Sequence, residues 1–123
     1  MQVQEQKKLS AEDVLSLINR EVASLPYERV YYALKRMRLK PLFQQTVETM
    51  RFCLAIHNLG LRVTASLIST LRGCTRDNVL TSLHILGDKR CLTLLRGSRN
   101  RCSRWVVSSD FLEKYVGEIE NEP

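Results

Sequence analysis

The segment TASLISTLRGCTRDNVLTSLHILGDKRCLTLLRGSRNRCSRWVV, residues 64–107, decides how this chain folds. Its first part, 64–73, has the spacing of a short helix that ends at Gly73. Thr75 then suits the N-cap of a second helix, 75–86. The apolar face of the first helix is expected to consist of Val63, Leu67, Ile68 and Leu71. That of the second helix is expected to consist of Val79, Leu83 and Leu86. The spacing therefore predicts two helices that cross over a shared core.

A basic β-hairpin is expected directly after these helices. Gly87 should end the second helix, and residues 91–108 then form two antiparallel strands around the turn GSRN, 97–100. Four arginines lie within the nine residues from 96 to 104, namely Arg96, Arg99, Arg101 and Arg104. Trp105 is expected to anchor the returning strand in the core.

Helices are also expected on both sides of this unit. Ser10, with Asp13 three residues later, is typical of a capping box, which opens a helix that reaches about Ser24. A second helix follows from Tyr27 to Leu39. The apolar stripes of these two helices comprise Val14, Leu17, Ile18, Val22, Val30, Tyr31, Leu34 and Met37.

Two further helix starts are predicted from the residue types at the ends of helices. Pro41 suits the first turn of a helix that reaches about Asn58. Its apolar face is expected to contain Phe43, Val47, Met50, Leu54 and Ile56. Asp110 suits the N-cap of a final helix, 111–120. The elements together predict a mainly α fold with one β-hairpin.

We expect a single domain over residues 1–123, because no linker, repeat or low-complexity segment interrupts the chain. Residues 1–40 would form an N-terminal helical extension. Residues 41–108 would form the core, and residues 109–123 a C-terminal helix and tail.

The net charge of +6 is distributed unevenly. Residues 1–60 carry nine Lys/Arg against six Asp/Glu, which gives +3. Residues 61–104 carry nine against two, which gives +7, and residues 105–123 carry one against five, which gives −4. A basic segment that coincides with a helix pair and a hairpin is typical of nucleic-acid binding.

The side of helix 75–86 that lies opposite its apolar face is polar, and it consists of Asp77, Asn78, Thr81, His84 and Asp88. Asn78 and Thr81 lie near the N-terminal end of the helix, and asparagine is well suited to reading adenine. Asp77 would repel phosphate unless it accepts a hydrogen bond from a cytosine amine. The residues expected to contact DNA are Arg72, Arg76, Asn78, Thr81, Ser82, Arg96, Arg99, Arg101 and Arg104.

Residues 41–108 resemble the winged helix-turn-helix transcription regulators of bacteria, archaea and their viruses. The resemblance rests on Thr75 as the cap, on the apolar spacing of the second helix and on GDKRCL, 87–92. The chain departs from the family at Arg90, where glycine is common. The resemblance implies that helix 75–86 reads the major groove of double-stranded DNA and that the hairpin, or wing, grips the backbone.

The resemblance also implies a homodimer built by helices outside the motif. A core of this size is not expected to bury all the apolar residues of helices 10–39 and 110–120, so some should meet a second copy. The acidic C-terminal helix would then face the basic residues 35–40 of its partner. Two roles are possible for residues 35–40: they form a solvated helix face, or they form a second DNA-binding site.

Three alternative functions are left open or set aside. A winged helix can be a protein–protein interaction module, and the same basic face could bind structured RNA. An enzyme is not expected, because the chain has no glycine-rich phosphate loop and none of the common hydrolase motifs. No cofactor or small-molecule effector is indicated by the sequence.

The remaining features indicate an intracellular, cytoplasmic protein. The N-terminus has no apolar signal segment, and no run of residues is long and apolar enough for a membrane span. The four cysteines lack zinc-ligand spacing, so that reduced thiols are the default, with disulfides left open for a hyperthermophile. A turn near Ser98 pairs Cys102 with a residue near Leu95, which leaves Cys91 and Cys102 out of register.

Overall fold

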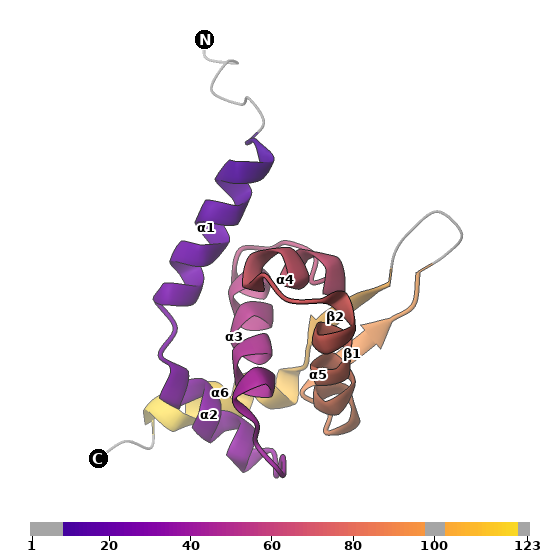
Figure 1. The fold of residues 1–123 in the computed structure, drawn as a ribbon. Helices are drawn as coiled ribbons and strands as arrows, with labels where there is room; N and C mark the ends of the chain where they lie inside the picture. Colours follow the sequence, from indigo (N-terminus) through magenta and orange to yellow (C-terminus); the bar gives the residue numbers. More distant parts are fainter. Residues whose placement is uncertain (1–8, 98–102, 121–123) are drawn as a thin grey trace.

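The computed structural model describes residues 9–97 and 103–120, with the side chains of 118–120 left out. Its elements are α1 (Ala11–Ala23), α2 (Tyr27–Arg36), α3 (Gln44–Asn58), α4 (Ala65–Arg72), α5 (Arg76–Asp88), β1 (Leu92–Leu95), β2 (Arg104–Val107) and α6 (Ser109–Glu120). The two strands form an antiparallel hairpin (Figure 1). The mainly α fold with one hairpin is therefore confirmed.

Two predicted N-caps, Ser10 and Thr75, are present with their hydrogen bonds, and Thr64 caps α4 in the same way. Ser10 and Asp13 form a reciprocal capping box at the start of α1. The Thr64 hydroxyl accepts from the Leu67 N–H at 3.1 Å, and the Thr75 hydroxyl accepts from the Asn78 N–H at 3.2 Å. These short polar side chains satisfy N–H groups that a helix start leaves without a partner.

The segment between α2 and α3 differs from the prediction. Helix α2 ends at Arg36, and Arg38 takes a left-handed conformation with φ 66°. Leu39 is then buried, and the chain continues in a loop through Pro41, so that this proline does not belong to a helical turn. Phe43 is the N-cap of α3 and is 56% exposed, whereas the sequence placed it on the inward face.

Two other predicted helix ends were also wrong. Helix α5 continues through Gly87 to Asp88, and the chain reverses at Arg90, which has φ 64°. Helix α6 is capped by Ser108, not by Asp110, because the Ser108 hydroxyl accepts from the Phe111 N–H at 3.1 Å. The same hydroxyl donates to the Arg90 carbonyl at 2.6 Å, which ties the start of α6 to the turn after α5.

Helix α3 lies at the centre of the core, where α1, α2, α5 and the hairpin pack against it. Its buried residues are Thr46, Val47, Thr49, Met50, Cys53, Leu54, Ala55 and Ile56. Burial raises the pKa of the Cys53 thiol well above its usual range. The described cysteines, Cys53, Cys74 and Cys91, are free thiols, and Cys102 lies outside the described residues.

The outer helices pack within the chain more than the sequence indicated. Helices α2 and α6 lie against each other, and Arg29 stacks 4.0 Å from the ring centre of Tyr115. Residues that were candidates for a contact with a second copy are buried here: Ile18, Val30, Leu34, Phe111 and Tyr115. The acidic α6 thus covers α2 of its own chain.

Arg51 on α3 holds the end of α1 in place. Its Nε donates to the Leu25 carbonyl at 2.8 Å, and its Nη2 donates to the Val22 carbonyl at 3.1 Å. Its Nη1 forms an ion pair with Glu48 at 2.9 Å. The Val22 carbonyl also accepts from the Leu25 N–H at 3.0 Å. The guanidinium therefore adds two hydrogen bonds to carbonyls at and just after the end of α1, and it fixes the α1–α2 turn on α3.

We predict that Arg51→Met destabilises the fold by about 2–3 kcal/mol, because hydrogen bonds from a charged donor contribute about 1.5–3 kcal/mol. Glu48→Gln removes only the ion pair, and we expect it to cost less than about 1 kcal/mol. Urea unfolding of both variants measures the difference. Equal losses would show that the carbonyl contacts do not hold the turn.

Candidate nucleic-acid interface

The turn between α4 and α5 sets the angle at which α5 leaves the core. Gly73 ends α4 with φ 68°, a left-handed conformation that glycine adopts without a Cβ penalty. The Ser69 hydroxyl donates to the Cys74 carbonyl at 2.7 Å and closes the turn. Helix α5 then buries Val79, Ser82, Leu83 and Leu86.

The hairpin register decides which of its residues face α5. The pairs are Leu92 with Val107, Thr93 with Val106, Leu94 with Trp105, and Leu95 with Arg104. The Trp105 N–H points away from β1 and donates to the Val63 carbonyl at 2.8 Å. Val63 therefore forms a β-bridge to Trp105 instead of belonging to the face of α4, where the sequence placed it.

Trp105 anchors the hairpin against α5, as predicted, and is only 4% exposed. Its ring meets the exposed His84 ring edge-on, with centroids 5.2 Å apart. A Cβ at Gly87 would lie 3.1 Å from Cζ3 of Trp105, so the glycine lets the ring lie close to the helix. At the base of the hairpin, burial raises the pKa of the Cys91 thiol to about 12.

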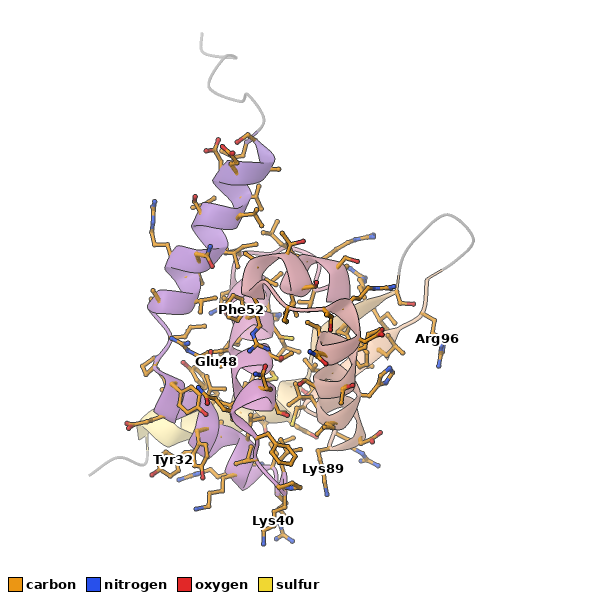
Figure 2. The ribbon with its side chains drawn as sticks, in the orientation of Figure 1. Tyr32, Lys40, Glu48, Phe52, Lys89 and Arg96 are labelled. Carbon is orange, nitrogen blue, oxygen red and sulfur yellow. The ribbon has the colours of Figure 1, made fainter. Side chains whose placement is uncertain are left out.

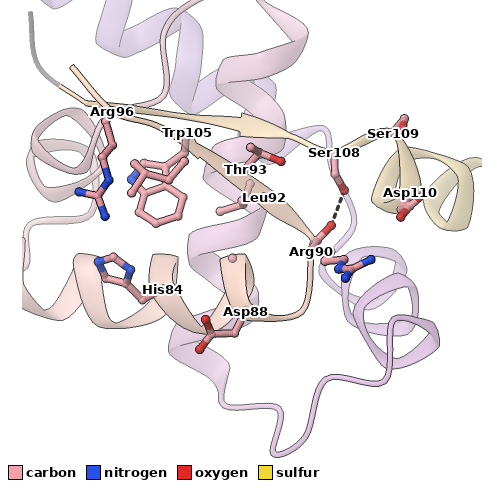
Figure 3. A pocket seen from close by; sticks show the side chains of 12 residues that line it. His84, Asp88, Arg90, Leu92, Thr93, Arg96, Trp105, Ser108, Ser109 and Asp110 are labelled. Atoms are coloured by element: carbon pink, nitrogen blue, oxygen red, sulfur yellow. Dashed lines mark hydrogen bonds between the residues drawn. The ribbon is translucent and has the colours of Figure 1, made fainter. Parts of the chain in front are cut away.

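A groove runs between α5 and the hairpin, and we call it the hairpin groove. Its wider end, of about 530 Å³, lies between α5, β1 and the start of α6 and includes Arg90, Asp88 and Asp110 (Figure 3). Its narrower end, of about 230 Å³, lies at the start of α4. The two ends share His84, Leu94, Arg96 and Trp105.

The narrow end of the hairpin groove carries positive charge without a carboxylate. The described residues that line it are Thr64, Ala65, Ser66, Arg76, Leu80, His84, Leu94, Arg96, Ser103 and Trp105. Arg76 comes from α5 and Arg96 from the hairpin, so two cations from different elements share one concave surface with the N-terminus of α4. This combination suits a phosphate group.

A second groove, of about 440 Å³, lies on the other side of α5, and we call it the α3 groove. It is lined by Phe43, Gln45, Thr46, Asn78, Thr81, Ser82 and Ile85. Arg72, at the end of α4, donates to the Gln45 side chain at 2.7 Å and to the Thr49 hydroxyl at 3.1 Å. Helix α5 is thus flanked by one groove on each side.

The predicted DNA-contacting residues do not form one cluster. Arg76 and Arg96 share the hairpin groove, whereas Asn78 and Thr81 are exposed on the side of the α3 groove. Arg72 is half-buried beside α3. The structure therefore brings the basic and the neutral polar candidates to opposite sides of α5.

Two predicted contacts need revision, and two cannot be placed. Ser82 is 4% exposed on the buried face of α5, so we withdraw it from the expected base contacts. Arg104 pairs with Leu95 on the face of the hairpin that points away from α5, beside Arg62. Arg99 and Arg101 lie outside the described residues.

Sequence reasoning missed Phe43, Gln45 and Ser66 as groove residues. The helical period placed Phe43 inward because the start of α3 was set too early. Gln45 and Ser66 are single polar residues whose position depends on how α3 and α4 pack. No local pattern marks them.

Comparisons with protein-family models, with curated proteins and with solved structures found no match to this chain. Within residues 9–97 and 103–120, no helix is long and apolar enough to cross a membrane. In the same part of the chain, no three His, Cys, Asp or Glu side chains are grouped to hold a metal ion.

We predict that Arg90→Gly is more stable than Arg90→Ala by about 1 kcal/mol, because only glycine adopts the left-handed conformation without a steric penalty. Both variants lose the same guanidinium, so the charge change cancels in the comparison. Urea unfolding measures the difference. An alanine variant of equal or higher stability would contradict the left-handed turn.

Proposed function

We propose that this protein binds double-stranded DNA in a sequence-specific manner and acts as a cytoplasmic transcription regulator of the winged-helix type. Helix α5 would enter the major groove, and the hairpin would contact the backbone beside it. We propose no catalytic role. The observation that carries the proposal is the narrow end of the hairpin groove, where Arg76 and Arg96 meet without a carboxylate.

The distribution of charge supports the same proposal. The +7 belongs to residues 61–104, the segment that contains α4, α5 and β1 and reaches the start of β2, whereas −4 belongs to residues 105–123. In Figure 2 Arg96 extends on the side of the hairpin, while Lys40 and Lys89 extend at the end of the molecule below α5. Cations beside a helix with an exposed polar face suit a phosphate backbone on each side of a major groove.

Binding to another protein is the second candidate function. The observation that favours it lies on a different surface from the two grooves beside α5. Exposed apolar residues on the loop before α4 and on the hairpin are Leu61, Leu95 and Val106. Leu95 and Val106 belong to the hairpin face that points away from α5. A docking protein would cover that face, whereas DNA would cover α5, so the two functions predict different sensitive residues.

We predict that wild-type protein binds duplex DNA with an affinity that falls steeply with salt. Arg76→Ala and Arg96→Ala should weaken binding to every sequence and lower the salt slope by about one each. Arg62→Ala is the matched control, because it removes the same charge from the loop that lies beside the opposite face of the hairpin. Fluorescence anisotropy at several salt concentrations measures all four proteins.

Asn78→Ala should behave differently and lose roughly 1–3 kcal/mol at particular base pairs only. A competition experiment, in which structured RNA is added to the complex of wild-type protein and duplex DNA, distinguishes DNA binding from RNA binding. If RNA displaces duplex DNA at equal concentration, or no duplex binds at low salt, DNA is not the partner.

We further propose that the protein is a homodimer and that α1 contributes to the interface. The first turns of α1 extend beyond the rest of the fold (Figure 1). Leu9 and Leu17 are exposed there, at 57% and 36%. Glu12 lies in the first turn of α1 and Arg20 in the last, so two antiparallel copies would place opposite charges together.

For the dimer, we expect light scattering at micromolar concentration to give twice 14.2 kDa, or 28.4 kDa. Glu12→Lys or Arg20→Glu alone should weaken the dimer, and the double variant should restore it, because the swap rebuilds both pairs across a two-fold axis. A monomer that persists on concentrating would rule the dimer out. If the double variant dimerises as weakly as the single variants, the interface does not pair Glu12 with Arg20 on α1.

A further inference from the structure

The α3 groove differs chemically from the hairpin groove, although both lie beside α5. No charged residue is among the described residues that line it. Its walls carry an amide and a hydroxyl from α5, on Asn78 and Thr81, and an aromatic ring from the start of α3, on Phe43. A neutral groove of this kind is poorly suited to a phosphate group.

Phe43 is the unusual member of this groove. It is the N-cap residue of α3, and its ring is 56% exposed. The loop before it is held by the buried Leu39, so the ring is presented from a fixed backbone position. Helix α3 begins at the next residue and is buried from Thr46 onward on its core face.

Two cations lie near this neutral groove, and one carboxylate, that of Asp77, is exposed on α5 next to Asn78. Arg72 is hydrogen-bonded to Gln45 in its wall, and Lys40 is exposed three residues before Phe43. A ligand that fits this arrangement has negative charge at its edges and a neutral, partly apolar centre. The major groove of duplex DNA has this character, with phosphates at the rim and base edges within.

We propose that the α3 groove reads an A·T base pair, with Asn78 on the adenine edge and Phe43 against the 5-methyl group of thymine. The adenine edge offers an acceptor and a donor that match an asparagine amide, and the thymine methyl is the apolar group of the major groove. This inference rests on the proposed function, because it assigns the specificity of the same α5 surface.

The experiment removes the methyl group alone. A duplex is selected from a random pool with wild-type protein, and each thymine in turn is replaced by deoxyuridine. We expect the affinity of wild type to fall about fourfold at one position, which corresponds to about 0.8 kcal/mol for one buried methyl group. Binding should be unchanged at the other positions.

Phe43→Ala should lose affinity for the thymine duplex and bind the deoxyuridine duplex equally well. Phe43→Leu should keep most of the discrimination, because leucine retains an apolar contact. Arg96→Ala is the matched control: it should weaken binding to both duplexes and preserve their ratio. Circular dichroism of each variant checks that the exposed position tolerates the change.

The outcomes separate this inference from the proposed function. If wild type binds duplex DNA but never distinguishes thymine from deoxyuridine, or if Phe43→Ala still distinguishes them, the thymine contact is wrong and DNA binding stands. If wild type binds no duplex at low salt, both proposals fall. Loss of affinity in Phe43→Ala with a flattened salt slope would assign the groove to backbone binding and overturn the base contact.

Discussion

The burial of α3 is the constraint on which the rest of this structure depends. A helix buried on most sides must satisfy its polar groups internally, and Thr49 does so by accepting from Arg72 at the end of α4. Arg51 leaves the same helix on another side and holds the α1–α2 turn. The two arginines fix the surroundings of α3 through directed contacts. Helix α5 and the hairpin then take their positions from a rigid centre.

Local sequence patterns predicted those helix ends that are set by a residue's interaction with the neighbouring backbone. The Thr75 cap and the Gly73 turn follow from the chemistry of single residues. The start of α3 could not be obtained in this way, because Pro41 suits a first helical turn by residue type but lies in the loop before α3. The apolar stripe of the outer helices likewise did not reveal whether α6 would cover α2 of its own chain.

The sequence predicted most of the residue types of the candidate site, but it did not predict how those residues are arranged in space. The arginines and the polar face of α5 are visible in the sequence, but their distribution over two grooves is a property of packing. Strand register sends Arg104 to the outer face and Trp105 to the inner one, and a shift by one residue would reverse both. Ser82 was named among the expected DNA contacts, although its spacing from Val79 and Leu86 places it on the apolar face of α5, where it is buried.

The acidic residues of α5 are consistent with the two proposed roles, in which the hairpin groove contacts the DNA backbone and the α3 groove contacts bases. Asp77 and Asp88 are exposed on the helix that the proposal places in the major groove, where a carboxylate disfavours phosphate. Apart from Arg76 at the start of α5, the cations of the proposed interface lie beside this helix, with Arg96 on the hairpin and Arg72 and Lys40 near the start of α3. The carboxylates of α5 would repel phosphates, and the cations beside α5 would attract them. This pattern would weaken binding in which α5 lies on a phosphate backbone more than binding in which α5 lies between the two backbones of a major groove. Under the proposed function, such a protein would bind non-specific DNA more weakly and in a defined orientation, and the proposed base contacts on one side of α5 would depend on that orientation.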